Sequence, residues 1–499
     1  MTTLWLPLNA ILIVFAALAM AALSYVLARR QRWHAAIVLM AIAALLIRGY
    51  ASADRVLHPW DERYHALVAK NLIERPLVPT LYRTPVLPYD YRTWTSNHVW
   101  LHKPPLALWA QAASMKVFGV HEFPVRLPSL LISTASVVLT YAIGSILLTP
   151  AIELLAAGFQ TFNGFLVDLT SGRRASDHVD TLLVFLFELG ILCALVASRR
   201  RPRVTGVALG AVTGLAYLTK SFLGLLILPV WAAMRSQLGP RSTMVKELAI
   251  AGVLTAIIAA PWTLYTSLTF PLEAAYERTY ALRHINEVME NQGGPPWKYL
   301  WEMPRFFGEL VYVPIAMAAF WMFKGGASAE RRAILLWLAI PYLLFSAFAT
   351  KMPGYVMVAA PAIFLVQADF WVWLWQRRQL QPTSLNRALL AFCLFLLAVL
   401  PARHLLGPTG PLEHRDRNPK WVRDLRALNE QIGDQQAVVF NIANTVDAMF
   451  YTPYIVYEYL PSADQVRELR RRGYRVYLFE DGSAPHVQPP ADVTVIRSE

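Results

Sequence analysis

The chain has 499 residues, of which 56% are hydrophobic and only 16% are charged. Soluble domains carry about 25% charged residues, whereas the apolar runs of about 18 residues that recur here are long enough to cross a bilayer. The composition therefore excludes an ordinary soluble enzyme and predicts a polytopic helical membrane protein. The net charge of +13 lies largely in short basic runs between apolar segments, a distribution typical of membrane topology and not of nucleic-acid binding.

The hydrophobic pattern predicts an all-α bundle of about twelve membrane-spanning helices. We place them at residues 5–28, 35–50, 125–148, 150–168, 180–198, 204–219, 221–235, 248–267, 305–323, 332–349, 355–375 and 387–405. The two short segments near 204–235 could instead form a broken pair that meets inside the bundle.

The basic residues predict the orientation, because Lys and Arg are enriched in cytoplasmic loops. The basic runs are Arg29–Arg32, Arg199–Arg203, Arg235–Lys246, Lys324–Arg332 and Arg377–Arg387. If these runs are cytoplasmic, the loops 51–124, 268–304 and 350–354 and the tail 406–499 face the exterior. This topology requires an external N-terminus, and in an inner membrane it would place the polar loops and the tail on the periplasmic side.

The expected domain organisation is two N-terminal helices (1–50), a first external loop (51–124), the remaining helices with the loop 268–304 (125–405), and a small soluble α/β domain (406–499). In the tail, residues 437–440 and 475–479 are predicted strands. Residues 421–432 and 465–472 are predicted helices, so the tail alternates helix and strand. Such a domain could serve as a packing or docking module, or it could recognise an acceptor.

The first loop carries two candidate motifs. Asp61 and Glu62 follow a span and could act as a general base or bind a cation, although they could also be solvated charges on a surface helix over 61–75. Lys103 precedes two prolines that open a predicted helix over 105–118. An ammonium projecting from that rigid point suits a phosphate oxygen, but it could equally belong to a lysine that snorkels past lipid headgroups.

Further charged residues lie at the outer ends of spans. Asp177 and Asp180 are three residues apart and share a helix face, and Arg174 near that helix start calls for an anion or a carboxylate partner. Lys220 and Lys351 lie at the external side of the membrane, where basic residues are rare, so we expect each to have an anionic partner. A lipid phosphate would satisfy both lysines, and so would anchoring to anionic membrane lipids.

The loop 268–304 reads as a charged helix followed by a turn, which could close over a substrate as a lid. Its residue His284 could complete a divalent metal site with His102 or Asp61. The ligand spacing does not decide this, so a divalent metal stays open and no other cofactor is predicted.

Five motifs in this order resemble the membrane glycosyltransferases of the GT-C superfamily. They are Asp61-Glu62, Lys103-Pro104-Pro105-Leu106, Asp180-Thr181-Leu182-Leu183, Leu218-Thr219-Lys220 and Lys351-Met352-Pro353-Gly354-Tyr355. The resemblance covers about residues 50 to 375. It is to the branch of dolichyl-phosphate-mannose–protein mannosyltransferase-like and aminoarabinose (lipid A) transferase-like enzymes.

The resemblance implies an enzyme that moves a sugar from a polyprenyl-phosphate carrier of the undecaprenyl type to an acceptor, with inversion at the anomeric carbon. It implies that Asp61 is the catalytic or metal-associated carboxylate and that Lys103 lies near the carrier phosphate. Two departures stand out: relatives often carry Glu at the position of His102, and they often separate the acidic pair from a following arginine by one residue, where Arg63 follows at once here.

The chemistry agrees, because cations stabilise the charge on a departing phosphate and a carboxylate can deprotonate an acceptor hydroxyl. We expect Lys103, Arg174, Lys220 and Lys351 to bind the phosphate and Asp61 to act as the base. If the acceptor were itself a phosphate, no base would be needed, and Asp61 would position the substrate or bind a cation instead. We expect Glu62, His102, Asp177, Asp180, Tyr355 and His284 to contact the substrates.

The acceptor could be lipid A or lipopolysaccharide, a protein hydroxyl or a surface glycan. The alternative function is a flippase or transporter of lipid-linked sugars. A transporter would place its charges near mid-membrane and show repeated halves, whereas this chain gathers charges at one face and shows no repeat.

Overall fold

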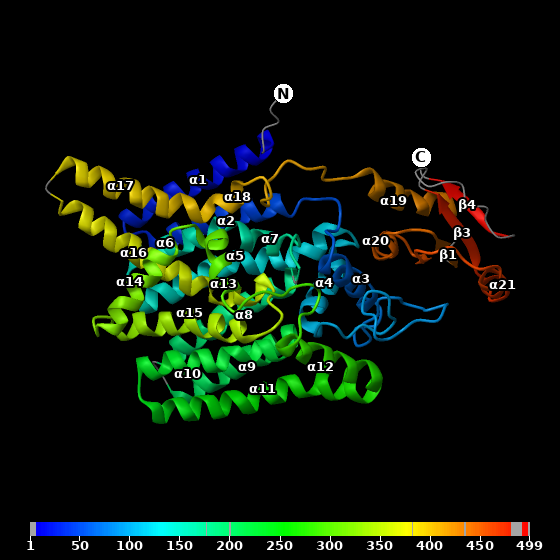
Figure 1. Ribbon diagram of the computed structural model, residues 1–499, viewed down its shortest axis with the longest axis horizontal. Coiled ribbons are helices and arrows are strands. Elements are labelled where there is room, and N and C mark those ends of the chain that lie inside the picture. Colours follow the sequence, from blue (N-terminus) through cyan, green and yellow to red (C-terminus); the bar gives the residue numbers. More distant parts are fainter. Residues whose placement is uncertain are drawn as a thin grey trace. The chain divides into compact units, whose positions relative to one another are not determined.

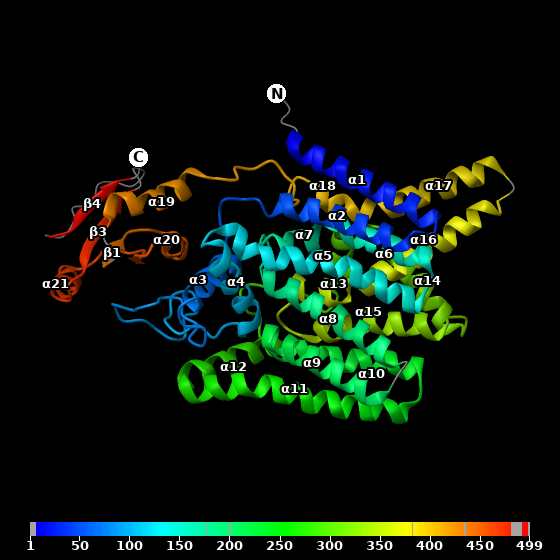
Figure 2. The same ribbon diagram turned by 180° about the vertical axis from the view of Figure 1, so that it is seen from behind.

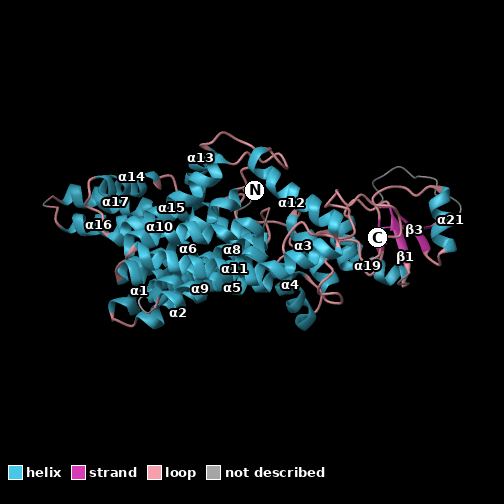
Figure 3. Cartoon of the chain, turned by 90° about the horizontal axis from the view of Figure 1, so that it is seen from below, coloured by secondary structure: helices cyan, strands magenta, loops and turns pink. Residues whose placement is uncertain are grey.

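The computed structural model describes residues 6–175, 177–198, 201–381, 383–433, 436–480 and 492–497. Helices dominate these residues, and the strands of the sheet belong to the C-terminal part of the chain (Figure 3). Two compact units are present: unit 1 comprises Met1–Ser52, Pro128–Thr269 and Glu277–His414, and unit 2 comprises Ala53–Leu127, Phe270–Tyr276 and Arg415–Glu499. Residues 199 and 200 of the predicted basic run Arg199–Arg203 lie outside the described residues.

Unit 1 contains most of the apolar helices (Figure 1). In chain order these are α1 (Leu8–Arg29), α2 (Trp33–Ala51), most of α5 (Glu122–Leu147), α6 (Pro150–Thr161), α7 (Gly164–Thr170), α8 (Asp177–Ser198), α9 (Pro202–Lys220), η1 (Ser221–Leu226), α10 (Ile227–Leu238) and α11 (Arg241–Thr269). They continue with the end of α12 (Pro271–Asn286), α13 (Lys298–Phe307), α14 (Tyr312–Phe323), α15 (Ala329–Ala347), η2 (Pro353–Ala359), α16 (Ala360–Gln379), α17 (Ser384–Val399), η3 (Leu400–Ala402) and α18 (Arg403–Leu406).

Eight helical ranges in the described residues are long and apolar enough to cross a membrane, or nine if the bent pair α13–α14 counts as one span. This finding makes the chain an integral membrane protein with a helical bundle. The predicted count of about twelve is larger because the predicted spans 204–219 and 221–235 fall in one qualifying range, and the predicted spans 150–168, 305–323 and 332–349 do not qualify as single helices. The apolar run 150–168 is divided at Phe162 between α6 and α7, and α13 and α14 meet at an angle of 117°.

The predicted break near 204–235 lies at η1, inside the range Pro202–Leu238 that qualifies as a single apolar segment. Ser221 adopts a positive φ of 48° directly after α9 ends. A Cβ atom on Gly224 would lie 2.3 Å from the backbone carbon of Ala216, eight residues earlier. Such proximity means that the chain folds back at η1, so that α10 runs against the direction of α9.

A row of glycines joins α9 to α11. Gly206, Gly210 and Gly214 recur every fourth residue, and a Cβ atom on any of them would clash with α11 at 2.8 Å or less. The contacts advance in the same direction along both helices, so α9 and α11 run parallel, and they lie side by side in Figures 1 and 2. Small residues at this spacing allow close backbone approach between membrane helices, which sets the position of Lys220 at the end of α9.

Unit 2 combines two stretches that the sequence analysis described separately, the first loop and the tail. Its elements are α3 (Asp61–Leu72), α4 (Pro105–Phe118), α19 (Lys420–Ile432), β1 (Ala437–Phe440), α20 (Thr445–Tyr451), β2 (Ile455–Val456), α21 (Ala463–Arg471), β3 (Arg475–Glu480) and β4 (Thr494–Arg497). The strands form a parallel sheet in the order β2-β1-β3-β4. Strand β1 is buried at every position, as a central strand of a parallel sheet should be.

The first loop and the tail share one hydrophobic core, in which side chains of α3 and α4 pack with those of β1 and β3. Lys70 of α3 strengthens this attachment because its ammonium donates to the carbonyl oxygens of Met449, Phe450 and Thr452 at 2.7–2.9 Å. These carbonyls lie at the C-terminal end of α20, where a cation is favourable. Burial lowers the pKa of Lys70 to about 8.

Candidate functional site

Asp61 is the first residue of α3, where a carboxylate is favourable to the helix dipole. The residue before it, Trp60, has a positive φ of 73° and an exposed side chain. Two further residues with a positive φ belong to the predicted site or lie next to it. Asp177 is itself a predicted site residue, and Ser221 directly follows Lys220. Non-glycine residues in this conformation carry strain that often occurs at functional sites.

Glu62, which the sequence suggested as a substrate contact, is fully buried beside Arg126, a fully buried residue of α5. The guanidinium donates to the carboxylate of Glu62 at 2.6 and 2.8 Å and to the carbonyl oxygens of Asp54 and Val56. Glu62 also accepts from the backbone N–H of His58 at 2.6 Å. These contacts give Glu62 a positioning role, since they fix the start of α3 and with it Asp61.

Asp54 joins the first loop to the tail within unit 2. Its carboxylate accepts from Arg415 at 2.7–2.8 Å and from Arg417 at 2.8 Å, and it lies 2.9 Å from Nε2 of His58. Burial by itself would lower the pKa of His58, but the charge of Glu62 and hydrogen bonds to Asp54 and Glu62 outweigh burial and raise it. The sequence analysis missed this network because its members lie far apart in the chain.

Lys103 and His102 lie just before α4, in the same unit as Asp61. The ring of His102 stacks on Trp94 with the centroids 4.6 Å apart and the planes 6° from parallel. Lys103 is half-buried and, among the described residues, forms no hydrogen bond or ion pair. An ammonium that is neither paired nor fully exposed is suited to an external anion.

In unit 1 the structure brings three of the predicted motifs together. The ammonium of Lys220 pairs with the carboxylate of Asp180, and both side chains are nearly buried. The same ammonium lies 5.0 Å from the ring centroid of Tyr355. A Cβ atom on Gly354 would lie 2.0 Å from Oδ2 of Asp180, so only glycine fits at that position. Residues up to 175 positions apart in the sequence therefore form one compact group.

Lys351 adds a second cation to this part of unit 1, and Lys298, which the sequence analysis did not single out, adds a third. The ammonium of Lys351 donates to the carbonyl of Phe348, and that of Lys298 donates to the carbonyls of Gly293 and Lys351 at 3.0 and 3.3 Å. In the described part of the chain neither forms an ion pair with a carboxylate. Burial, followed by the charge of Lys298, lowers the pKa of Lys351.

The predicted lid segment holds the irregular segment 349–352 around Lys351 in place. The backbone N–H groups of Ala349, Thr350 and Lys351 donate to the carbonyls of Ile285, His284 and Gln292 at 2.6–3.0 Å. The hydroxyl of Tyr299 on α13 donates to the carbonyl of Met352 at 3.0 Å. His284 is buried at the end of α12, and its Nδ1 lies 3.0 Å from the carbonyl of Tyr280, so the residue serves the backbone framework of this segment.

Arg174 is engaged by a carboxylate of its own unit. Its guanidinium lies 2.9–3.0 Å from Oδ2 of Asp168, which also lies 2.8 Å from Nε2 of His404. Its charge is therefore already balanced, unlike that of Lys351. Asp177 is fully buried at the start of α8, and its neighbour His178 lies 2.8 Å from the hydroxyl of Ser129.

No group of three or more His, Cys, Asp or Glu side chains among the described residues is arranged to hold a metal ion. His102 and Asp61 lie in unit 2 and His284 in unit 1. We derive no chemical step through a metal.

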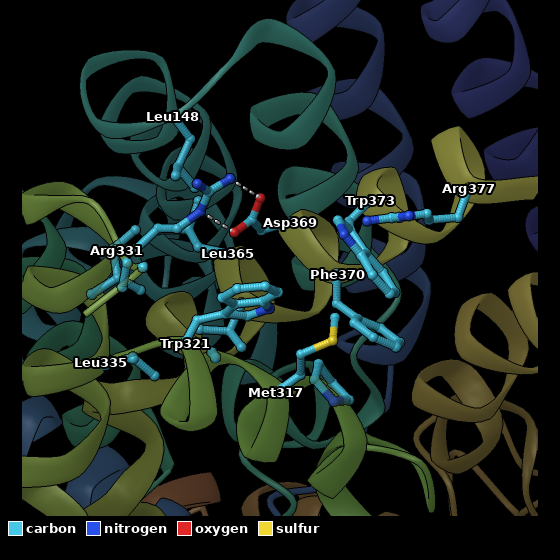
Figure 4. Close-up of a pocket in the computed structure, with 16 residues that line it drawn as sticks. Leu148, Met317, Trp321, Arg331, Leu335, Leu365, Asp369, Phe370, Trp373 and Arg377 are labelled. Carbon is cyan, nitrogen blue, oxygen red and sulfur yellow. Dashed lines mark hydrogen bonds and ion pairs between the residues drawn. The ribbon is translucent and has the colours of Figure 1, made fainter. Parts of the chain in front are cut away.

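A cavity of about 300 Å³ lies in unit 1 between α14, α15 and α16 (Figure 4). Aromatic side chains including Trp321, Phe370 and Trp373 line it, and Arg331 donates to Asp369 at 2.7 and 2.9 Å across it. None of the predicted site residues lines this cavity. It lies along the second half of α16, whereas Lys351 and Tyr355 precede that helix, so it is not part of the candidate site.

Comparison with known proteins agrees with the motifs. The family described as dolichyl-phosphate-mannose-protein mannosyltransferase matches residues 102–265. An undecaprenyl phosphate-alpha-4-amino-4-deoxy-L-arabinose arabinosyl transferase of Pseudomonas aeruginosa is 29% identical over 288 residues, which is 53% of this chain and 49% of that protein. A protein of the same description from Pseudomonas fluorescens is 28% identical over 300 residues, 57% of this chain and 51% of that protein.

Solved structures decide the fold. The structure of ArnT from Cupriavidus metallidurans bound to undecaprenyl phosphate matches with a TM-score of 0.60 at 16% identity, covering 87% of this chain and 88% of that one. The chain has the GT-C fold. The archaeal oligosaccharyltransferase AglB from Archaeoglobus fulgidus, solved with an inhibitory peptide and a dolichol-phosphate, matches with a TM-score of 0.55 at 13% identity, covering 86% of this chain and 65% of that one.

The resemblance to the aminoarabinose transferase branch of GT-C enzymes, which the five motifs indicated, is thus confirmed. This GT-C chain spans about half the length of the curated relatives that it matches in sequence. The identity to the solved structures is low, so they carry the fold and not the details of the site.

Proposed function

We propose that this protein is a glycosyltransferase that takes a sugar from a polyprenyl-phosphate donor of the undecaprenyl type. The observation that carries the proposal is the ion pair of Lys220 with Asp180 beside Gly354 and Tyr355, in a chain with the GT-C fold. Lys351 lies three residues before Gly354, and its carbonyl accepts from Lys298. Three ammonium groups and one paired carboxylate leave a net positive charge. Such a group is suited to hold a phosphate oxygen while charge develops on it.

The reaction requires two contributions from the protein. The lysines stabilise the polyprenyl phosphate as the bond between the anomeric carbon and the phosphate oxygen breaks. Asp61 accepts the proton of the acceptor hydroxyl as that oxygen attacks the anomeric carbon from the opposite side, which inverts the configuration. Glu62 and Arg126 hold Asp61 in position, and Lys103 provides a further cation for the phosphate.

We infer further that the active site and unit 2 face the periplasm. The basic runs between the spans support this orientation, because Lys and Arg are enriched in cytoplasmic loops. We also retain about twelve spans as the proposed topology, in which the range 202–238 crosses twice and the α6–α7 pair and α15 cross once each. None of the comparisons favours the alternative of a transporter for lipid-linked sugars.

The test uses purified protein in nanodiscs with a radiolabelled undecaprenyl-phosphate sugar. We would follow release of undecaprenyl phosphate in the presence of lipid A, a Ser/Thr-rich peptide or water alone. We expect acceptor-dependent release that Asp61→Asn abolishes while the variant keeps the thermal unfolding midpoint of the wild type. Movement of the donor across the bilayer of sealed proteoliposomes, without any release, would instead identify a transporter.

A further inference from the structure

Unit 2 contains a cavity of about 500 Å³ that the proposed chemistry does not use. One wall is the loop from Tyr82 to Ser96 with the first turn of α3, and the other consists of residues 443–446 and 457–459 of the tail. The volume falls within the range of about 300–1,000 Å³ that is typical of small-molecule sites. Both walls belong to the same unit, so the cavity is a feature of one compact body.

Aromatic rings form a rigid part of the wall. Tyr457 stacks between Tyr82 and Phe440, with the ring centroids 5.4 Å apart on each side. Tyr459 packs against Tyr457 at 5.6 Å but keeps 42% of its surface exposed, and Tyr89 across the cavity keeps 44% exposed. The buried rings therefore support two tyrosines whose own surfaces are available to a ligand.

The rest of the lining is polar and of mixed charge. Hydroxyl groups come from Thr93, Thr95, Ser96 and Thr445. Arg63 contributes a guanidinium, whereas Glu458 and Asp90 contribute carboxylates. Asp90 pairs with Arg92, so the lining carries no surplus of positive charge for a phosphate-rich ligand, and the many hydroxyls disfavour an acyl chain.

We propose that this cavity binds the sugar rings of a glycan, and that this glycan is the acceptor of the transfer reaction. Sugar rings present apolar C–H faces that pack on aromatic rings and hydroxyls that both donate and accept hydrogen bonds, which matches the two parts of the lining. The identification of the ligand as the acceptor rests on the proposed function, whereas the binding of a glycan to this cavity is independent of that function.

The position of the cavity supports its assignment to the acceptor. Arg63 and Tyr64 line it and lie two and three residues after Asp61 on α3, so Tyr64 shares a helix face with Asp61. Burial raises the pKa of Tyr64, and the charges of Asp447 and Asp61 add to this effect against the opposing charge of Arg63. A glycan in the cavity would thus lie within about one helical turn of the proposed base.

The test measures binding without any donor. Wild-type protein in nanodiscs would be mixed separately with cellotetraose, maltotetraose, chitotetraose and a Ser/Thr-rich peptide, and saturation-transfer NMR would report which ligand protons contact the protein. We expect contacts from the ring C–H protons of at least one oligosaccharide. We expect Tyr459→Ala and Tyr89→Ala to weaken that binding about tenfold, or about 1.4 kcal/mol, and Tyr459→Phe to retain it.

The matched control is Tyr25→Ala, which removes an exposed tyrosine from α1 in unit 1 and should bind as wild type does. Binding that is unchanged in Tyr459→Ala, binding of the peptide in place of any sugar, or no binding at all would each overturn the proposal. Release of undecaprenyl phosphate by the wild type is measured in parallel. If release fails while tyrosine-dependent sugar binding persists, the transferase assignment falls and the glycan site stands.

Discussion

Each unit of the molecule surrounds a carboxylate with cations, but the two clusters are built in different ways. In unit 2, Glu62 receives two short hydrogen bonds from Arg126 and one from a backbone N–H, and the pair is fully buried. In unit 1, Asp180 has Lys220 as an ion-pair partner, while Lys351 and Lys298 donate only to carbonyl oxygens.

The difference separates a structural cluster from a binding cluster. A saturated buried pair has no capacity left for a ligand, and its value lies in fixing the backbone around it. In a cluster with more cations than carboxylates the cations repel one another, and a bound anion removes this repulsion. Substitutions in the first cluster should therefore lower the stability of the protein, and substitutions in the second should lower its activity.

The largest effect is expected for Arg126→Ala. Removing the guanidinium leaves the carboxylate of Glu62 buried without its main partner, which typically costs about 3–5 kcal/mol. The thermal unfolding midpoint in detergent should fall strongly and donor turnover should fall with it.

The double variant Glu62→Gln/Arg126→Met provides the control, because it removes both charges together. It should unfold at a higher temperature than Arg126→Ala. Equal destabilisation of the two variants would show that Arg126 stabilises the protein by something other than its ion pair with Glu62.

Lys351→Ala tests the binding cluster. Loss of one preorganised cation should slow release of undecaprenyl phosphate by about 10²–10³-fold. Stability should hardly change, because the ammonium has no carboxylate partner in the described ranges and is disfavoured by burial and by Lys298.

Lys324→Ala is the matched control, since Lys324 is an exposed lysine of unit 1 that lies over the ring of Phe320. It should turn over the donor as wild type does. If Lys351→Ala destabilised the protein as strongly as Arg126→Ala, the distinction between the two clusters would not hold.

A smaller effect is expected for Gly354→Ala. The new methyl group would lie 2.0 Å from Oδ2 of Asp180 and must displace that carboxylate from Lys220. Overpacking of this kind costs about 1–3 kcal/mol, so release of undecaprenyl phosphate should slow by about tenfold or more. Gly252→Ala on α11 is the control, because a Cβ atom there meets nothing within 4 Å.

The sequence predicted local elements well. The helix over 105–118 coincides with α4, and the strand at 437–440 coincides with β1, because prolines and a β-branched apolar run mark them directly. The sequence assigned Lys220 and Lys351, with Lys103 and Arg174, to the carrier phosphate and Asp180 to substrate contact, and the structure places Asp180 beside Lys220. In the helix and the strand, the residues that indicate the element lie within the element itself or a few residues from it.

Features that depend on distant partners were not predictable from one sequence. Arg126 lies 64 residues from Glu62, and Arg415 lies 361 residues from Asp54. Lys298 carries no local motif, and only the fold brings its ammonium to the carbonyl of Lys351. The helix break at Phe162 lies in the apolar run 150–168, which reads as one continuous span although α6 and α7 are each too short to qualify.

Asp447 sharpens the comparison within unit 2, since it is a buried carboxylate whose arginine partner is weaker than that of Glu62. Arg63 lies 3.5 Å from Oδ2 of Asp447, whereas Arg126 approaches Glu62 to 2.6 Å. Burial raises the pKa of Asp447 to about 7, and the charge of Arg63 offsets this only in part. Asp447 should therefore be protonated in the folded protein at pH 5, when the same side chain is ionised in the unfolded chain.

The sign of the stability effect follows from this difference. The folded state binds the extra proton between the unfolded pKa of 3.8 and the folded value of about 7. The free energy of unfolding should therefore fall as the pH rises through this window and level off above it. Asp447→Asn should flatten this dependence, whereas Asp464→Asn, at an exposed carboxylate, should leave it unchanged.

Infrared difference spectra between pH 5 and 8 give the direct measurement, because a protonated buried carboxyl has a carbonyl band that its ionised form lacks. A band that titrates near neutral pH and disappears in Asp447→Asn would show that burial outweighs Arg63. A carboxylate that stays ionised at pH 5 would mean that Arg63 pairs with it as firmly as Arg126 does with Glu62. In that case the charge of Arg63 would be balanced, and the polar lining of the glycan cavity would consist of its hydroxyls, its tyrosines and the carboxylates of Glu458 and Asp90.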